Sequence, residues 1–363
     1  MAIQRNRRKW FKKLLYFAVI AVCASAILSM TSADVFFRCF FGRSELRAQT
    51  LELRYADIDQ NAYPRRAVSF LSGKNRLRGY FYGSGEQGVI LIVHGMNGGA
   101  DSHLPEILYF ADHGWRVFAF DGTGVRDSEG SGTVGLSQLR ADTLAALEYL
   151  SQSEYGALPV VLYGHSAGGY AAAAALESGY NVRAAVCISA FNSPVDTMCY
   201  NAGRYVGDVL AYSQYPFLWL ENLLVSGSDG NDTAVDAINA TDTPALIVSG
   251  TEDEVVPERI SVAGCRDRIT NPNVTYLTIS EGSRSEHSTA WFSEEAAEYR
   301  DEVVSELDAL EARYGDDIPD GILQTFWSAV DQELLYETDE DFMNTVNAFC
   351  LDAIRSVPAS RYD

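Results

Sequence analysis

Continuous apolar runs and helical periodicities alternate along most of this chain. An alternating apolar and polar pattern first predicts a hairpin of two strands, at residues 67–71 and 76–82. The next runs are apolar throughout, as expected for strands covered on both faces: residues 89–93, 117–120, 160–162, 184–188 and 245–248. Helical spacing predicts helices at residues 104–113, 136–150 and 169–178. A last strand is expected at residues 274–279. This order predicts an α/β fold with a doubly wound, mostly parallel sheet.

Two segments depart from this alternation. Residues 192–240 are rich in Tyr, Trp and Leu without a strand pattern, and we expect an inserted cap. Its aromatic residues fit either the lining of an acyl or aryl pocket or a hydrophobic patch closing the sheet edge. Residues 288–338 are largely acidic and helical, with helices expected at 294–314 and 322–336, before a final helix at 341–355. Such a charge run is more often a solvated helix face than a binding site, so its role and any protein partner stay open.

A basic segment and an apolar stretch open the chain. Residues 5–13 contain six basic side chains, and residues 14–33 then carry no charge. About 20 residues of helix cross a hydrocarbon core of about 30 Å, whereas the apolar part of a cleavable signal is usually about 7 to 15 residues. We therefore favour a transmembrane anchor over a removed signal peptide, for which Thr31-Ser32-Ala33 offers a cleavage site. Both interpretations place the rest of the chain on the exported side, either held at the cell membrane or secreted.

The predicted organisation has three parts. Residues 1–33 form the basic segment and anchor, residues 34–64 form a connector with a Phe-rich start, and residues 65–363 form the main domain. The cap at 192–240 and the acidic helical insertion at 288–338 lie within that domain. A length of 363 residues suffices for one large α/β domain with a substantial core, or for two small ones.

Charge and cysteine usage exclude several classes of function. The chain has a net charge of −21, and its six basic residues before Asp34 leave −27 on the rest. Such a surface repels nucleic acid, so no nucleic-acid partner is expected. The six cysteines show no CxxC or His-spaced cluster, and we expect no metal or organic cofactor. Cys23 and Cys187 are predicted to be buried thiols, and a Cys199–Cys265 disulfide is left open.

The segment Gly164-His165-Ser166-Ala167-Gly168 carries the strongest chemical signal. It follows an apolar strand and precedes an alanine-rich helix. A serine hydroxyl becomes a useful nucleophile when a sharp strand-to-helix turn exposes it to a base on one side and to substrate on the other. Side chains at the two glycines would crowd the neighbouring strand or helix. The pattern predicts a nucleophile elbow with Ser166 as the catalytic nucleophile.

The order of later residues supplies an acid and a base. Asp253 follows the strand at 245–248 and is placed to orient an imidazole, with Glu252 and Glu254 as competing carboxylates. Of the five histidines, only His287 lies downstream of Asp253, just past the last strand. A group with a near-neutral pKa is needed to take the serine proton and return it to the leaving group. We therefore predict a Ser166, Asp253 and His287 triad.

A glycine-rich turn after the strand at 89–93 predicts an anion-binding site. In the run from His94 to Gly99, backbone N–H groups can point at a developing oxyanion. The expected oxyanion hole consists of the N–H groups of Met96 and Ala167. His94 is expected to pack and hydrogen-bond locally.

These motifs together resemble the α/β-hydrolase superfamily, and within it the Bem46-like, monoglyceride-lipase-like and serine-aminopeptidase-like group. The resemblance includes His94-Gly95, the loop at residues 120–130 and the acid loop at 250–257, and it covers about residues 65 to 290. The loop has Gly122-Thr123 where the family usually has Arg-Gly, and no glycine precedes His287.

The expected function is that of a serine hydrolase acting on a small-molecule acyl substrate. The triad would cleave a carboxylic ester through an acyl-enzyme on Ser166. Peptidase or acyltransferase chemistry uses the same machinery. A catalytically silent α/β-hydrolase fold serving as a surface binding module is the alternative from another class, because a fold alone does not imply activity.

Overall fold

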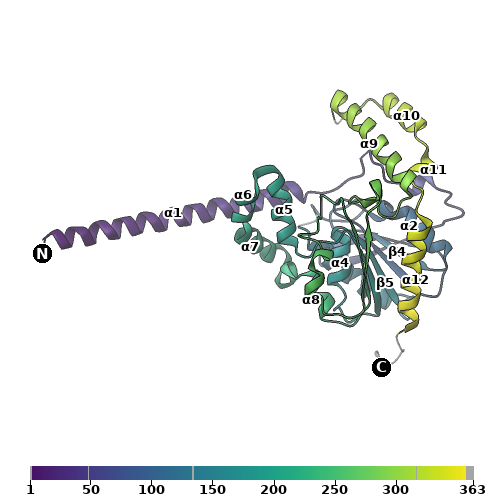
Figure 1. The fold of residues 1–363 in the computed structure, drawn as a ribbon, viewed down its shortest axis with the longest axis horizontal. Coiled ribbons are helices and arrows are strands. Elements are labelled where there is room, and N and C mark those ends of the chain that lie inside the picture. The colour runs from purple at the N-terminus through teal and green to yellow at the C-terminus, as the bar shows by residue number, and fades with distance from the viewer. Residues whose placement is uncertain (1, 48, 133–134, 316, 357–363) are drawn as a thin grey trace.

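The computed structural model describes residues 2–47, 49–132, 135–315 and 317–356, and its centre is a twisted sheet (Figure 1). In the described part of the chain the sheet has eight strands, in the order β1-β2-β4-β3-β5-β6-β7-β8. The strands are β1 (Arg66–Ser72), β2 (Asn75–Tyr82), β3 (Val89–Val93), β4 (Arg116–Asp121), β5 (Val160–His165), β6 (Val182–Ile188), β7 (Ala245–Gly250) and β8 (Val274–Ile279). β2 pairs antiparallel with β1 and β4, and the pairs from β4 to β8 are parallel. The predicted α/β fold with a mostly parallel sheet is confirmed.

Both faces of the sheet are covered, which explains the continuous apolar runs. On β3, Leu91 belongs to one hydrophobic cluster, and Ile90 and Ile92 belong to the cluster on the opposite face. Successive strand residues point to opposite faces, so a strand buried on both sides has no polar position. The first face carries α3 (Gln138–Gln152), α4 (Ala167–Ala174) and α8 (Ala234–Asn239), and the second carries α2 (Leu104–Asp112) and α12 (Glu340–Ser356). Short 3-10 helices are η1 (Tyr55–Asp57), η2 (Ala100–His103), η3 (Ser228–Asn231), η4 (Ala263–Arg268) and η5 (Gly282–Ser285).

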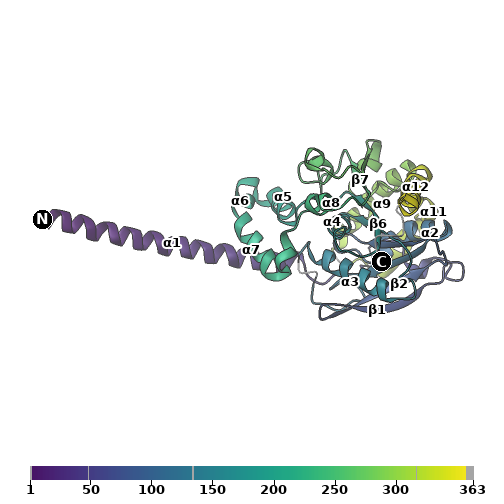
Figure 2. The ribbon, with the colours of Figure 1, turned by 90° about the horizontal axis from the view of Figure 1, so that it is seen from below.

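A single long helix, α1 (Ala2–Phe40), precedes the sheet and projects away from it (Figures 1 and 2). It is longer than the anchor expected at residues 14–33 and continues through the start of the expected connector. Its window Cys23–Phe40 is long and apolar enough to cross a membrane, by length and composition. The basic side chains at positions 5, 7, 8 and 9 lie outside the described residues.

The cysteine expectations are corrected in part. Cys187 is buried, but Cys23 is exposed on α1, because the projecting helix has no protein neighbour at that level. All six cysteines are free, so the Cys199–Cys265 disulfide is not formed.

Residues 194–226 form three helices that stand beside the end of α1 in both views (Figures 1 and 2). They are α5 (Pro194–Val206), α6 (Asp208–Ser213) and α7 (Tyr215–Ser226), and α7 contacts α1. This is the larger part of the segment expected to form a cap.

The acidic segment forms α9 (Glu294–Tyr314), α10 (Asp320–Ala329) and α11 (Gln332–Leu335). The single helix expected at 322–336 is wrong, because it is divided at Asp331. The Asp331 carboxylate accepts hydrogen bonds from the N–H groups of Glu333 and Leu334 and so starts a new helix there. The far ends of α9 and α10 pack on each other away from the sheet (Figure 1).

Candidate active site

Ser166 occupies the tight turn between β5 and α4. Its backbone has φ 55° and ψ −117°, a region that side-chain-bearing residues rarely adopt. A Cβ at Gly164 would lie 2.1 Å from the carbonyl oxygen of Gly168, and a Cβ at Gly168 would lie 2.0 Å from that of Val93. The expectation that neither glycine tolerates a side chain is therefore met, and the turn lifts Ser166 above the carboxyl ends of the strands.

The predicted base and acid lie next to this serine. The Nε2 atom of His287 is 2.9 Å from Ser166 Oγ, and its Nδ1 atom is 2.8 Å from Asp253 Oδ2 and 3.0 Å from Oδ1. Asp253 follows β7, and His287 follows β8 and η5, so the ends of three strands supply the three groups. A carboxylate facing Nδ1 favours the tautomer that donates there and accepts from Ser166 at Nε2.

Asp253 is held as a carboxylate. The backbone N–H groups of Val255 and Val256 donate to its Oδ1 at 3.0 and 2.7 Å. Burial alone would raise the pKa of Asp253, but the hydrogen bond and charge of His287 and the Val256 N–H outweigh it, so the pKa is lowered. Glu252 and Glu254, the competing carboxylates, are exposed to solvent.

The glycine-rich turn after β3 lies against Ser166. A Cβ built at Gly95 would be 3.6 Å from Ser166 Cβ. Among the described residues the Met96 N–H has no hydrogen-bond acceptor. Ala167 is the first residue of α4, where an N–H has no partner within the helix. Two donors are thus available near Ser166, and their use as an oxyanion hole stays a prediction.

His94 fixes the start of this turn. Its Nδ1 lies 2.6 Å from the carbonyl oxygen of Gly95, and the Gly122 N–H donates to its Nε2 at 2.9 Å. One ring nitrogen must therefore donate while the other accepts, which requires the neutral imidazole. Burial lowers the pKa of His94 to about 4, in agreement with that state. The residue packs and hydrogen-bonds locally, as expected.

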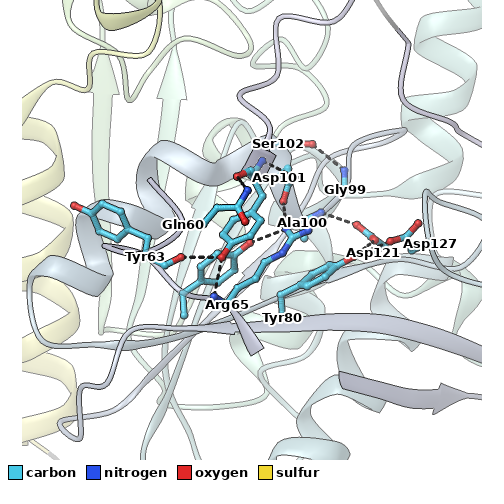
Figure 3. Close-up of polar contacts among 12 residues, drawn as sticks. Gln60, Tyr63, Arg65, Tyr80, Gly99, Ala100, Asp101, Ser102, Asp121 and Asp127 are labelled. Carbon is cyan, nitrogen blue, oxygen red and sulfur yellow. Dashed lines mark hydrogen bonds and ion pairs between the residues drawn. The ribbon is translucent and has the colours of Figure 1, made fainter. Parts of the chain in front are cut away.

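A second network ties the far end of the turn to β4 (Figure 3). Asp121 Oδ1 accepts from the Ala100 N–H at 2.8 Å, and the Tyr80 hydroxyl donates to Asp127 at 3.1 Å. Arg65 pairs with Asp101 at 2.8 Å and lies over the Tyr80 ring. Burial raises the pKa of Asp121 to about 6, with the nearby negative charges of Asp101 and Asp127 adding to the effect.

The sequence analysis assigned no role to His165, which stands inside the elbow. Its Nε2 lies 2.8 Å from the carbonyl oxygen of His287, close enough to donate a hydrogen bond to it. This contact links β5, which leads to Ser166, directly to the loop that carries His287. The position of His165 next to Ser166 was the only sequence signal of a role for it. Its partner, the His287 carbonyl group, lies 122 residues further along the chain.

Two cavities meet at Ser166. One, of about 200 Å³, is lined mainly by apolar side chains of α1 and α5. The other, of about 450 Å³, includes His287 and extends to Trp291, Arg300 and Tyr336. Met96, Ser166 and Val255 line both. Within the described ranges, no group of three or more His, Cys, Asp or Glu residues could hold a metal ion.

The sheet order, the elbow and the strand-end groups define an α/β-hydrolase fold. A family profile described as serine aminopeptidase S33 matches residues 84–213, from just before β3 through the elbow to the end of α6. The resemblance to the α/β-hydrolase superfamily is thereby confirmed, and the match supports a hydrolase in general terms.

Two crystal forms of one solved esterase agree on the fold. The esterase Pf2001 of Pyrococcus furiosus is 17% identical, with 76% of this chain and 98% of that chain covered and a TM-score of 0.53. A second crystal form of it gives 17% identity, 74% and 98% coverage and a TM-score of 0.52. Est1E of Butyrivibrio proteoclasticus, solved with ferulic acid, is 18% identical over 67% of this chain and 100% of that chain, with a TM-score of 0.48. Comparison with curated protein sequences gives no match.

Proposed function

We propose that this protein is a serine hydrolase that cleaves a carboxylic ester through an acyl-enzyme on Ser166. The observation that carries the proposal is the continuous chain of contacts from Ser166 Oγ to His287 at 2.9 Å and on to Asp253 at 2.8 Å. Hydrogen-bond reach between nucleophile, base and orienting acid is the geometric requirement for this chemistry.

In the acylation half, His287 Nε2 takes the Ser166 proton as Oγ attacks the ester carbonyl carbon. The carbonyl oxygen becomes an oxyanion, which the N–H groups of Met96 and Ala167 would stabilise. Each such donor commonly contributes about 2.7 to 4 kcal/mol to transition-state stabilisation. Collapse of the tetrahedral intermediate breaks the bond to the alcohol oxygen, which receives the proton from His287 and leaves as an alcohol.

In the second half, water replaces the alcohol. His287 takes a proton from the water as its oxygen attacks the acyl carbon, and then returns that proton to Ser166 Oγ as the acid is released. Asp253 keeps its negative charge throughout and stabilises the imidazolium. Its low pKa supports this role.

Two observations speak against a silent binding module. All three triad groups are in contact, and the positive φ of 55° at Ser166 is a strained conformation that presents its hydroxyl to His287. A peptidase is the second candidate, because the matching family profile is described as a serine aminopeptidase.

We also propose that α1 anchors the protein in the cell membrane. The support is the uncharged stretch at residues 14–33 behind a basic segment, within a helix that projects from the domain (Figure 1). By the positive-inside rule the catalytic domain would lie on the exported side.

Labelling with a fluorophosphonate probe tests the catalytic proposal. The wild-type protein should be labelled, Ser166→Ala should not, and Ser151→Ala, at an exposed serine of α3, should be labelled as the wild type is. Comparison of the turnover of p-nitrophenyl butyrate with that of an aminoacyl anilide distinguishes an esterase, which favours the ester, from a peptidase, which favours the anilide. A folded wild-type protein that stays unlabelled would contradict the hydrolase proposal.

A further inference from the structure

We propose that the end of α1 forms one wall of the acyl-binding cavity, so that the enzyme acts on long-chain esters held in the same bilayer as its own anchor. This inference rests on the proposed hydrolase function and names the substrate class for it. It follows from where α1 ends, how it is attached and what surrounds it.

The apolar cavity joins the anchor helix to the nucleophile. Phe36 and Phe40 of α1 and the following Phe41 line it on one side, and Met198 and Tyr205 of α5 line it on another. Ser166 lies in the same cavity. A volume of about 200 Å³ is below the 300 to 1,000 Å³ of pockets that enclose whole ligands. The cavity therefore suits a hydrocarbon chain, with the remainder of the substrate in the larger cavity beyond Ser166.

The end of α1 is part of the hydrophobic core. Phe37 and Phe41 are only 6% and 5% exposed. Both belong to the cluster that packs on α3 and α4, and a Cβ at Gly135 would lie 2.9 Å from the Phe37 ring. A flexible tether would leave these side chains in solvent. The helix is instead docked, so its position fixes the position of the cavity.

The charge pattern of α1 puts this cavity at the membrane surface. Residues 14–33 are uncharged, and Asp34 and Arg38 then form an ion pair at 2.9 Å. A helix rises 1.5 Å per residue, so Phe40 lies about 10 Å beyond the end of the uncharged stretch. Phe40 is half exposed while it lines the cavity, so the cavity opens beside the helix at this level.

The surface around this opening has the character of a membrane-contacting face. Between residues 205 and 226 only Asp208 and Glu221 carry charge, in a chain with 49 acidic residues. Tyr205 is 82% exposed and Val209 is 89% exposed. Further exposed apolar side chains of these helices are Val206, Leu210, Trp219, Leu220, Leu224 and Val225.

The occupant of this face is the bilayer, because the face is continuous with α1. The helices α5, α6 and α7 stand beside the end of α1 in both views (Figures 1 and 2). Apolar helix faces at the membrane surface bury their side chains about 5 to 10 Å into the boundary between headgroups and chains. A lipid chain could then pass from the bilayer into the cavity without crossing water.

A two-vesicle experiment tests the inference on the wild-type full chain. The protein is reconstituted into phosphatidylcholine vesicles that contain a long-chain ester of a fluorogenic alcohol. The ester carries a second long alkyl chain, attached through a non-hydrolysable ether, which prevents its exchange between vesicles. In a parallel sample the same ester resides in separate vesicles without protein. We expect at least tenfold faster hydrolysis when enzyme and ester share a bilayer, and equal turnover of water-soluble p-nitrophenyl butyrate in both samples. Equal long-chain rates in the two samples would overturn the inference.

Variants of the wall give an independent measurement. Ala202→Phe narrows the cavity from α5, and Phe36→Ala widens it from α1. The ratio of kcat/KM for p-nitrophenyl dodecanoate to that for the butyrate should fall at least tenfold in Ala202→Phe and change more than threefold in Phe36→Ala. Val35→Trp, on the exposed side of the same helix, should keep the wild-type ratio.

Fluorophosphonate labelling of each variant distinguishes a wrong hydrolase proposal from a wrong assignment of the cavity wall. A folded wild-type protein that is not labelled contradicts the hydrolase proposal itself. Labelled wall variants with an unchanged chain-length ratio contradict the wall assignment and leave the hydrolase intact. Should a wall variant lose labelling through misfolding, the two-vesicle comparison on the wild type still decides.

Discussion

The two cavities that meet at Ser166 differ in lining and in origin. The smaller one is lined mainly by apolar side chains, many of them from α1 and α5, whereas the larger one includes Glu52, His287 and Arg300 and extends to Tyr336, which follows α11. An ester also has two unlike halves on either side of its carbonyl carbon. On the proposed ester hydrolysis, this difference fits an acyl chain held on the side of α1 and an alcohol held on the side of the acidic segment.

The loop after β3 forms part of the boundary between them. Met96 lines both cavities, and the loop is fixed at one end by His94 and at the other by Asp121. Changes at the triad should therefore affect every substrate, and changes in one cavity should affect one half of the substrate.

Removal of the acid should have the largest effect, irrespective of which cavity the substrate fills. Asp253→Asn keeps the shape but favours the wrong His287 tautomer, and kcat should fall about 10⁴-fold for short-chain and long-chain esters alike. Steady-state kinetics with both esters provides the measurement. Glu252→Gln, at an exposed neighbouring carboxylate, should stay within twofold of the wild type. A similar loss in both variants would refute the assignment of Asp253.

Loss of one backbone donor should have the next largest effect. Met96→Pro removes the N–H assigned to the oxyanion hole, and kcat should fall about 10²- to 10³-fold. Met96→Ala retains that N–H and should lose less than fivefold in kcat while changing the ratio between substrates, because the side chain lines both cavities. Equal losses of kcat in the two variants would remove Met96 from the oxyanion hole.

Asp121 supports the loop after β3, and its titration predicts that the free energy of unfolding depends on pH. The pKa of Asp121 is raised to about 6 in the folded protein, above its ordinary value of 3.8. The folded state therefore holds the proton more tightly, and this stabilisation is present below about pH 4 and is lost as the pH rises through 6.

Asp121→Asn lacks this titration, so its stability relative to the wild type should increase between pH 4 and 7 by at most about 3 kcal/mol. Thermal unfolding midpoints of both proteins at pH 4, 5, 6 and 7 in one detergent measure the difference. A constant difference across this range would show that Asp121 titrates normally.

A change in the larger cavity, at Arg300, should have the smallest effect, and it should depend on the alcohol part of the ester. Within the described residues no carboxylate lies in ion-pair distance of the Arg300 guanidinium, which donates to the Leu335 carbonyl and lies 4.2 Å over the Phe292 ring. Burial lowers the pKa of Arg300 to about 10, so the group is still charged at neutral pH.

Arg300→Gln should raise KM about tenfold for an ester whose alcohol part bears a carboxylate, because a hydrogen bond to a charged group contributes about 1.5 to 3 kcal/mol. The neutral amide of the same ester should be unaffected. Arg313→Gln, exposed near the end of α9, is the matched control. The same change in KM for both esters would show that the charge of Arg300 plays no part.

The strands and the order of site residues could be predicted from the sequence because their signals are local. The last strand, Val274–Ile279, and the helix Glu294–Tyr314 have the expected bounds. Ser166, Asp253 and His287 could be selected because chain order in a parallel sheet decides which strand ends meet. The glycines of the elbow were informative because a side chain there has no space.

The lining of the cavities could not be predicted, because it depends on contacts between distant segments. Phe36 and Phe40 have helical spacing, but nothing in their neighbourhood shows that α5, more than 150 residues later, packs opposite them. Arg300 looked like one charge among many on an acidic helix. The break at Asp331 was missed because a capping aspartate inside an amphipathic pattern looks like one more polar residue.

The docked end of α1 has a consequence for engineering of the chain. A shortened version cut at the end of the uncharged stretch, after Ala33, would keep Phe37 and Phe41, whereas a cut after Phe41 would remove both and open the core beside Leu136. The helix α1 and the domain are therefore not separate units joined by a flexible linker. On the proposed anchoring and ester hydrolysis, replacing this helix with an unrelated membrane segment would alter which esters are accepted.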